Sequence, residues 1–301
     1  MIISGSNYEI NDIINKIKSK FNLSNYGPIK YLLGITIEQT KLEYRISQTN
    51  FIENLLSNFK ITQNKRTNPP CTLNNITNDK PFDPTTYKIV IGSYIYLAKC
   101  TRPDISFALN HAAQCENPTY ADWYKIINIL KYLNNTKYYK ILYNGLGPFH
   151  GYTDADFAGD KEDRKSTSGH TFLMGNSPIS WYSKKQTIVA TSTAEAEFIS
   201  ASECIKKALW FRNIIYELFN HKSPITIYTD NKSSKIIMEN GEFSTKLKNI
   251  DIRFHFGNDN IKKNKIVLKY KNTSEMVADV LTKNINGTKL KSFTSKIFDI
   301  S

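Results

Sequence analysis

Four carboxylates in the second half of the chain have the strongest potential for chemistry. The triplet Tyr-Thr-Asp occurs twice, each time at the end of an apolar strand pattern, and Asp154 and Asp230 are its last residues. Glu197 lies in the first turn of a long helix pattern, and Asp279 opens the last helix pattern. A carboxylate at the end of an apolar strand is costly unless it faces solvent or binds a cation.

Carboxylates at two strand ends and two helix starts can converge at one edge of a sheet and hold hard divalent cations. Two ions about 3.5–4 Å apart can clamp the attacking and leaving oxygens of an in-line phosphoryl displacement. Spacing alone leaves an alternative, in which each carboxylate is a solvated turn residue, a helix N-cap or a salt-bridge partner. We prefer that alternative for four other acids of this region: Asp160, Glu162, Asp163 and Glu203.

Two further acids lie close to the four in sequence. Asp156 lies on the same strand face as Asp154, so it is a candidate to hold the metal ligands in position without binding the metal itself. Glu195 precedes Glu197 by two residues and therefore points to another part of the helix, where we expect it to cap the N-terminus.

The elements predicted around these residues form an α+β layer with mixed strand directions. Short segments bounded by Gly, Asn and Pro indicate an antiparallel meander at 151–159, 170–175 and 179–183. A long amphipathic helix follows over 193–219, with Ser192 or Thr193 as its N-cap. The pattern then predicts a strand, two helices, a strand and a helix, at 225–229, 233–240, 248–263, 266–271 and 274–284.

The first half has a different pattern, in which helices predominate. It predicts a β-hairpin over 31–48 and helices at 8–23, 50–59, 89–100, from 103 onward and at 121–136. Residues 62–86 lose all periodicity and collect Pro, Asn and Thr, which indicates an exposed linker. Asn144-Gly145 and Gly147-Pro148 break the pattern again. We therefore predict two domains, 1–147 and 148–301.

Composition excludes several classes of protein. The 301 residues include 18 Tyr and 16 Phe, too many aromatic residues for a disordered chain. The 13 Gly and 10 Pro exclude a collagen-like protein. No apolar run approaches the roughly 18 residues of a membrane span, and the first residues lack the features of a signal peptide.

Charge and cysteine usage indicate an intracellular protein, in the cytoplasm or the nucleus, with polyanionic partners. Forty Lys and Arg against 27 Asp and Glu give a net charge of +13, which favours polyanions through counterion release. Lys-rich usage can also reflect an AT-rich genome. The four cysteines are too few for a disulfide scaffold and too far apart for a CxxC motif, so we expect them to be reduced.

Several longer motifs carry a resemblance to a known family. GYTDADFAGDKEDRKSTSGHTFLMGNSPISWYSKKQTIVATSTAEAEF, IYTDNKSS, KNIDIRFHF and VADVLTK occur in this order. Together they closely resemble the ribonuclease H domain of Pol polyproteins from copia-type LTR retrotransposons. KYLLGITIE, GSYIYLAKCTRPDISFALN and DWYKIINILKYLNNT resemble the end of the reverse transcriptase of that family and its connection.

The resemblance implies a ribonuclease H-like mixed five-stranded sheet with flanking helices, preceded by a partial reverse-transcriptase palm, thumb and connection region. It implies that Asp154, Glu197, Asp230 and Asp279 are catalytic and bind two Mg²⁺ ions, for which Mn²⁺ can substitute. Glu197 is preferred over Glu195 because Ala-Glu-aromatic matches the family pattern. The implied reaction is hydrolysis of the RNA strand of an RNA–DNA hybrid, which makes this chain an endonuclease.

The chain departs from the family in the residues around the site. Many ribonucleases H carry a catalytic His in the loop before the last Asp, and the corresponding residues 271–275 contain none. His255 is a candidate substitute, with a structural or RNA-facing role as the alternative. Asn249 stands where the family often has His, and Phe157 where it often has Trp. Both changes are compatible with folding.

A larger departure concerns the polymerase. In the family, the Tyr-Val-Asp-Asp motif comes immediately before residues that resemble the first five of this chain. We therefore do not expect reverse transcription from this chain alone, and we interpret it as a fragment of an element. The missing polymerase part, in cis or in trans, is then a possible partner.

Basic and hydroxyl residues near the predicted site are candidates for nucleic-acid contact: Arg164, Ser166, Thr167, Ser168, Lys184 and Lys185. The alternative for the lysines is that they only solvate a sheet edge. Two functions remain open at this point. One is a hybrid-cleaving nuclease, and the other is a degenerate remnant that binds nucleic acid through charge without catalysis.

Overall fold

The three segments predicted as a meander form one side of a five-stranded sheet. The computed structural model describes residues 2–59, 69–71, 78–145, 147–240 and 251–300. Its second half contains the antiparallel strands β5 (Phe149–Ala155), β6 (Thr167–Met174) and β7 (Ser177–Lys185). β8 (Ile225–Thr229) pairs parallel with β5, and β9 (Ile266–Tyr270) pairs parallel with β8. The order β7-β6-β5-β8-β9 is that of a ribonuclease H-like α+β fold, as predicted.

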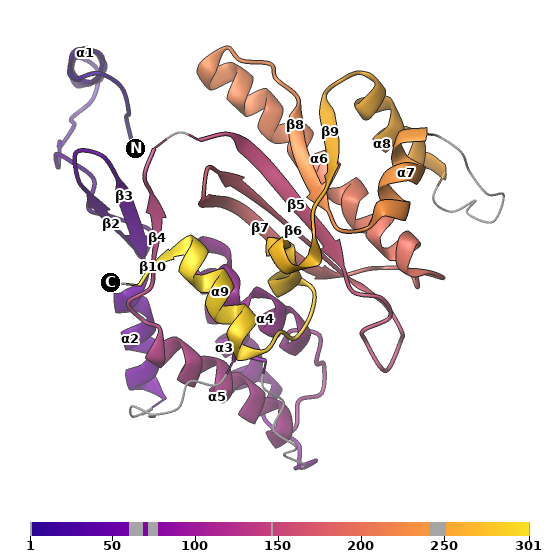
Figure 1. The fold of residues 1–301 in the computed structure, drawn as a ribbon. Helices are drawn as coiled ribbons and strands as arrows, with labels where there is room; N and C mark the ends of the chain where they lie inside the picture. Colours follow the sequence, from indigo (N-terminus) through magenta and orange to yellow (C-terminus); the bar gives the residue numbers. More distant parts are fainter. Residues whose placement is uncertain (1, 60–68, 72–77, 146, 241–250, 301) are drawn as a thin grey trace.

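Three helices pack on one face of this sheet (Figure 1): α6 (Thr193–Phe219), α7 (Lys232–Asn240) and α8 (Asp251–Lys262). The bounds of α6 match the prediction because strong signals mark both ends. The Ser192 side chain caps its N-terminus by accepting from the Glu195 backbone N–H, and Asn220 ends it with a left-handed φ of 51°.

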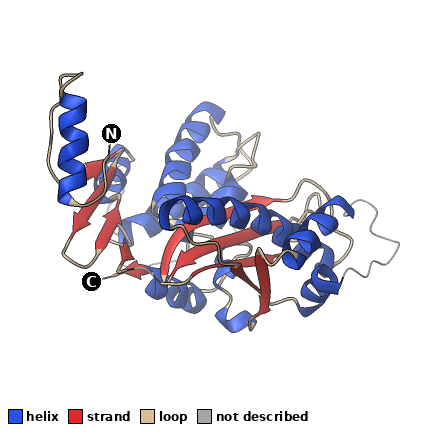
Figure 2. Cartoon of the chain, turned by 90° about the horizontal axis from the view of Figure 1, so that it is seen from above, coloured by secondary structure: helices blue, strands red, loops and turns tan. Residues whose placement is uncertain are grey.

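The first half contains a second sheet and most of the remaining helices. The hairpin predicted over 31–48 forms β1 (Tyr31–Leu32), β2 (Ile35–Gln39) and β3 (Tyr44–Ser47). The helices of this half are α1 (Asn7–Lys18), α2 (Thr49–Asn58), α3 (Pro84–Cys100), the short 3-10 helix η1 (Pro103–Ile105), α4 (Ser106–Ala112) and α5 (Tyr120–Asn135). α1 buries no residue and stands apart from the body of the molecule (Figure 2). Much of the predicted linker, residues 62–68 and 72–77, lies outside the described residues.

The C-terminal segment shares a sheet and a hydrophobic core with the first half of the chain. The first sheet has the order β1-β2-β3-β4-β10, in which β4 (Lys140–Tyr143) pairs with the C-terminal strand β10 (Phe298–Asp299). Helix α9 (Gly287–Ile297) lies against the first-half helices (Figure 1). The core of the first half therefore includes six side chains from the C-terminal segment: Val280, Leu281, Leu290, Phe293, Ile297 and Phe298. We call residues 277–299 the C-terminal clasp.

The single helix predicted over 274–284 is wrong. The chain there forms two short 3-10 helices, η3 (Thr273–Glu275) and η4 (Val277–Leu281). Met276 between them has an extended backbone, with φ −74° and ψ 103°, and its side chain is buried against the sheet. The tertiary contact of Met276 thus overrides the helical periodicity of the sequence.

The described residues show two further features that bear on the sequence analysis. No helix among them is long and apolar enough to cross a membrane. Cys71, Cys100, Cys115 and Cys204 are all free thiols.

His170, buried in β6, predicts how stability depends on pH. Burial, together with the nearby Lys207 charge, lowers its pKa from 6.5 to about 3. Below pH 6.5 the unfolded chain therefore binds a proton that the folded chain does not, so stability falls as the pH is lowered. The ring stacks on Tyr182 with centroids 4.7 Å apart, which His170→Phe preserves. We expect wild type to lose about 2 kcal/mol more than His170→Phe between pH 7 and pH 5. Urea unfolding at both pH values tests this, and equal losses would contradict it.

Candidate metal centre

The two Tyr-Thr-Asp triplets lie side by side in the sheet. β5 and β8 run parallel, and Tyr152 pairs in register with Tyr228. The two tyrosine rings stack with centroids 5.2 Å apart. Asp154 and Asp230 each follow two residues later, so they lie on the same sheet face at the carboxyl end of adjacent strands. The repeated triplet is thus the sequence signature of two carboxylates brought together by register.

The third carboxylate reaches this edge through η4. Asp154 pairs with Gly169 on β6, and a Cβ on this glycine would lie 2.5 Å from Thr282 Cγ2 and 2.9 Å from Leu281 Cβ. The missing side chain therefore lets η4 pack directly on β6. Asp279 on η4 is brought to the sheet in this way.

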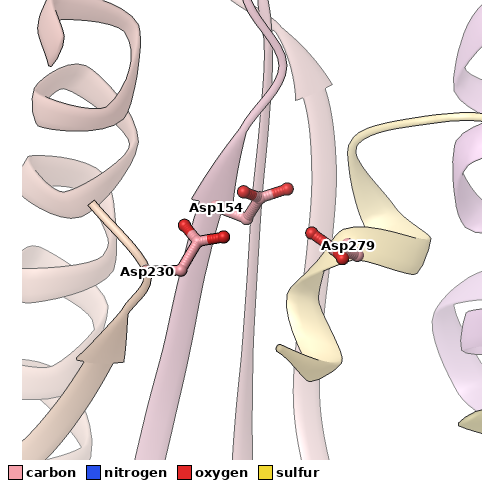
Figure 3. A group of neighbouring side chains, drawn as sticks. All are labelled: Asp154, Asp230 and Asp279. Carbon is pink, nitrogen blue, oxygen red and sulfur yellow. The ribbon is translucent and has the colours of Figure 1, made fainter. Parts of the chain in front are cut away.

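Asp154, Asp230 and Asp279 form one group (Figure 3). One carboxylate oxygen of each lies within 4.8 Å of those of the other two. Asp154 and Asp279 are each 1% exposed, and Asp230 is half-buried. Thr282 Oγ1 donates to Asp154 Oδ2, and Thr273 Oγ1 donates to Asp230 Oδ2 at 2.6 Å.

Glu197 approaches the group from the opposite face of the sheet. Thr153 Oγ1 donates to Ser200 Oγ on α6 at 3.1 Å, so Thr153 faces the helix while its neighbour Asp154 faces away. Glu197 is buried on the same helix, and its Oε2 has no hydrogen-bond partner among the described residues. It is not a member of the group of three within 4.8 Å, but its charge acts on the same carboxylates.

Glu195 has a different environment, although it is only two residues away. The backbone N–H and the hydroxyl of Thr191 donate to its Oε2, at 2.7 and 2.5 Å. Its carboxylate is therefore engaged at the N-terminus of α6, where the helix dipole favours negative charge.

Burial and mutual repulsion dominate the electrostatics of the group. Burial raises the pKa of Asp154 to about 7, with further upward contributions from Asp279 and Asp230, while Lys283 and Thr282 oppose the change. Burial also raises the pKa of Glu197 well above its ordinary range, and the charges of Asp154 and Asp230 add to that effect. Carboxylates arranged in this way are stabilised as anions by an added cation.

Two lysines of the C-terminal clasp contact the group. Lys283 Nζ lies 2.7 Å from Asp279 Oδ1 and 3.4 Å from Asp154 Oδ2. Lys289 Nζ on α9 forms an ion pair with Asp279 Oδ2. Neither lysine is among the site residues predicted from the sequence. The spacing of Asp279 and Lys283, four residues apart, is the one signal that indicated a contact.

The donor set fits hard divalent cations. All four candidates are carboxylates, the ligands that Mg²⁺ and Mn²⁺ prefer. Within the described part of the chain, no donor reaches the buried acceptor Glu197 Oε2, and such an atom is costly unless a cation or proton satisfies it. Asp154, Asp230 and Asp279 are therefore the residues able to hold a metal, with Glu197 beside them.

The acids expected to have other roles lie outside this group. Asp156 follows β5 and accepts from the Thr167 backbone N–H, and burial raises its pKa to about 6. Asp160 and Asp163 both pair with Lys185, at 2.6 and 2.9 Å. Glu203 pairs with Lys206 at 2.9 Å.

The structure separates the candidates for nucleic-acid contact. Ser168, a predicted nucleic-acid contact, is 4% exposed, and its Oγ accepts from Gln186 Nε2 at 2.9 Å. Its strand is covered on both faces, by α6 and by η4. Ser166 and Thr167 are buried as well. Lys185 is engaged with its two aspartates, whereas Lys184 and Arg164 are both exposed.

Three residues noted as departures from the family have different placements. His255 lies on the exposed surface of α8. Phe157, directly after the strand that carries Asp154, is 46% exposed. Asn249 lies outside the described residues.

Comparisons with known proteins find relatives along most of the chain. Residues 1–73 match the family model described as reverse transcriptase (RNA-dependent DNA polymerase). The chain is 32% identical over 290 residues to the retrovirus-related Pol polyprotein from transposon TNT 1-94 of Nicotiana tabacum, covering 91% of this chain and 22% of the relative. It is also 32% identical over 297 residues to the retrovirus-related Pol polyprotein from transposon RE1 of Arabidopsis thaliana, covering 96% of this chain and 20% of the relative.

The chain thus spans about a fifth of the length of these relatives. Among solved structures, LC11-RNase H1 in complex with RNA/DNA hybrid matches with a TM-score of 0.35 and 13% identity. That match covers 44% of this chain and 93% of the other.

Proposed function

The chain belongs to the copia-type family of retrovirus-related Pol polyproteins from transposons, and from this we propose that it is a ribonuclease H that cleaves the RNA strand of RNA–DNA hybrids. The observation that carries the proposal is the group formed by Asp154, Asp230 and Asp279 within 4.8 Å, with buried Glu197 beside it. Without a bound cation, such a group of carboxylates destabilises the folded state, since like charges in a buried site raise the energy of the anionic form.

The side chains have separable roles in the proposed reaction. Two divalent cations held there would activate a water and stabilise the leaving 3′ oxygen. Asp154 and Asp230 are fixed by adjacent strands, so they provide rigid oxygen ligands. Asp279 sits on η4 and closes the site from the other side, and Glu197 supplies a further acceptor from α6.

Lys184 and Arg164 are the proposed contacts to the phosphate backbone of the hybrid, since the other candidates are buried or paired. Such contacts hold the duplex in place without reading its sequence. The 2′-hydroxyl groups exposed in the shallow minor groove would distinguish the RNA strand from DNA.

The test is cleavage of an end-labelled RNA annealed to DNA by the purified protein, with Mg²⁺ or Mn²⁺ and with excess EDTA. We expect cuts in the RNA strand that require the metal, and none in duplex DNA of the same sequence. Binding without cleavage, with an affinity that falls steeply as salt is raised, would instead support the non-catalytic remnant that binds through charge.

Glu195 and Glu197 provide a matched pair for testing the ligand assignment. We expect Glu197→Gln to weaken Mn²⁺ binding at least tenfold with little loss of stability, because a buried carboxylate that burial disfavours as an anion is replaced by a neutral amide. Glu195→Gln should bind Mn²⁺ normally and lose about 1 kcal/mol of stability, because it weakens the bonds from Thr191. Isothermal titration and urea unfolding measure the two effects, and the reverse pattern would reject the assignment.

A further inference from the structure

We propose that Lys283 is an internal cation that competes with divalent metal for the position between Asp154 and Asp279. The inference rests on the proposed metal centre and adds a residue that controls its occupancy. Its basis is the position of the ammonium group, 2.7 Å from Asp279 Oδ1 and 3.4 Å from Asp154 Oδ2. A metal ion that bridged these two carboxylates would need the same oxygens.

The two lysines at the site are not equivalent. Lys289, on α9, forms an ion pair with one of the described carboxylates, that of Asp279, at the oxygen Oδ2. Lys283 contacts carboxylates from two different elements, β5 and η4, and thereby offsets the repulsion between them. Burial raises the pKa of Asp154, and the charge of Lys283 is the largest of the influences that lower it.

The Lys283 side chain is able to leave the site. It is 39% exposed, whereas the Asp154 and Asp279 side chains are 2% and 1% exposed. The carboxylates are therefore fixed within the fold, and the ammonium group approaches them from the solvent side on a flexible stem. Divalent metal and the Lys283 ammonium repel each other at these distances, so binding of one favours departure of the other.

The competition predicts that loss of the Lys283 charge tightens metal binding. We expect Lys283→Met to bind Mn²⁺ about tenfold tighter than wild type at low ionic strength, by isothermal titration of the full chain. We also expect a melting temperature several degrees below wild type without metal, because the repulsion is no longer offset. Added Mn²⁺ should therefore raise the melting temperature more in this variant than in wild type.

A matched control removes the same charge elsewhere. Lys263 pairs with Asp259 on α8 at 2.8 Å, with the same four-residue spacing, and both side chains are exposed. Lys263→Met should bind Mn²⁺ as wild type does, which separates a local effect from a change in net charge. Lys283→Arg should also bind as wild type does, because it keeps the positive charge. Lys283→Gln is a second neutral variant should Lys283→Met fold poorly.

The outcomes separate this inference from the proposed function. If wild type binds Mn²⁺ and the neutral Lys283 variants bind it no tighter, or more weakly, the competition is refuted while the metal centre stands. If neither wild type nor the variants bind Mn²⁺, the metal centre itself fails.

Discussion

Asp154→Asn is expected to lower the rate of hybrid cleavage by about a thousandfold or more while leaving the fold intact. Metal ions supply several kcal/mol of charge stabilisation in phosphoryl transfer, and each 1.4 kcal/mol corresponds to a factor of ten. Asp154 lies at the centre of the site, since the charges of Asp230, Asp279 and Lys283 all influence its pKa. Single-turnover cleavage of a labelled hybrid, at saturating protein and metal, measures the effect.

The same substitution should not destabilise the metal-free protein. Burial raises the pKa of Asp154 to about 7, so its charged form is disfavoured in the fold, and a neutral amide of the same size removes that cost. Asp259→Asn, in the exposed pair on α8, is the control for loss of one carboxylate. An Asp154→Asn protein that cuts as fast as wild type would eliminate the proposed catalytic role of the group.

The second half of the chain, residues 148–301, is expected not to fold stably when it is produced alone. The C-terminal clasp would then expose Val280, Leu281, Leu290, Phe293, Ile297 and Phe298, which are all buried in the first-half core. At roughly 1.5–3 kcal/mol for each of these six large apolar side chains, the lost burial is roughly 9–18 kcal/mol, comparable to the whole stability of a domain. Asp279 lies within this segment, so the metal centre should be lost with it.

Thermal unfolding followed by circular dichroism, together with Mn²⁺ titration, compares this fragment with the full chain. We expect a broad transition or aggregation, and no metal binding. Addition of residues 1–147 in trans should restore part of both properties, because β4 and the helices of the first half supply the missing surface. A fragment with the melting temperature and the metal affinity of the full chain would show that the clasp is dispensable.

The sequence was sufficient to predict a helix or strand where residues at its ends mark its limits or where its apolar residues recur with a clear period. The limits of α6 and β8 match the sequence prediction. Ser192 caps the start of the helix, and a polar residue comes directly after the last residue of each element. α9 was not predicted, although Asn286 caps it, because its few apolar residues bury only against a distant part of the chain. β4 and β10 were also missed. They are short, and their partners are distant in sequence: β10 pairs only with β4 among the described strands, more than 150 residues earlier, and β4 also pairs with β3.

The part of the site that could be predicted most directly from the sequence consists of the carboxylates at the ends of strands. The two Tyr-Thr-Asp triplets indicated adjacent carboxylates, and the structure places them in register. The contribution of Gly169 could not be predicted, because it depends on the approach of Thr282 and Leu281 to β6. Lys289 reaches Asp279 from α9, and the burial of Ser168 depends on α6 and η4, so no local pattern indicated either.

The pairing of β10 with β4 also sets an order of events during synthesis. Arg45 on β3 forms an ion pair with Asp299, 254 residues later, at 2.6 Å. The first sheet thus lacks its last strand until the entire ribonuclease H-like half has left the ribosome. Contacts so distant in sequence close slowly, since loop-closure entropy is lost before they form. The N-terminal half therefore cannot complete its folding as it emerges, in contrast to the usual vectorial order, and the two halves should reach the native state together once the C-terminal clasp has been made.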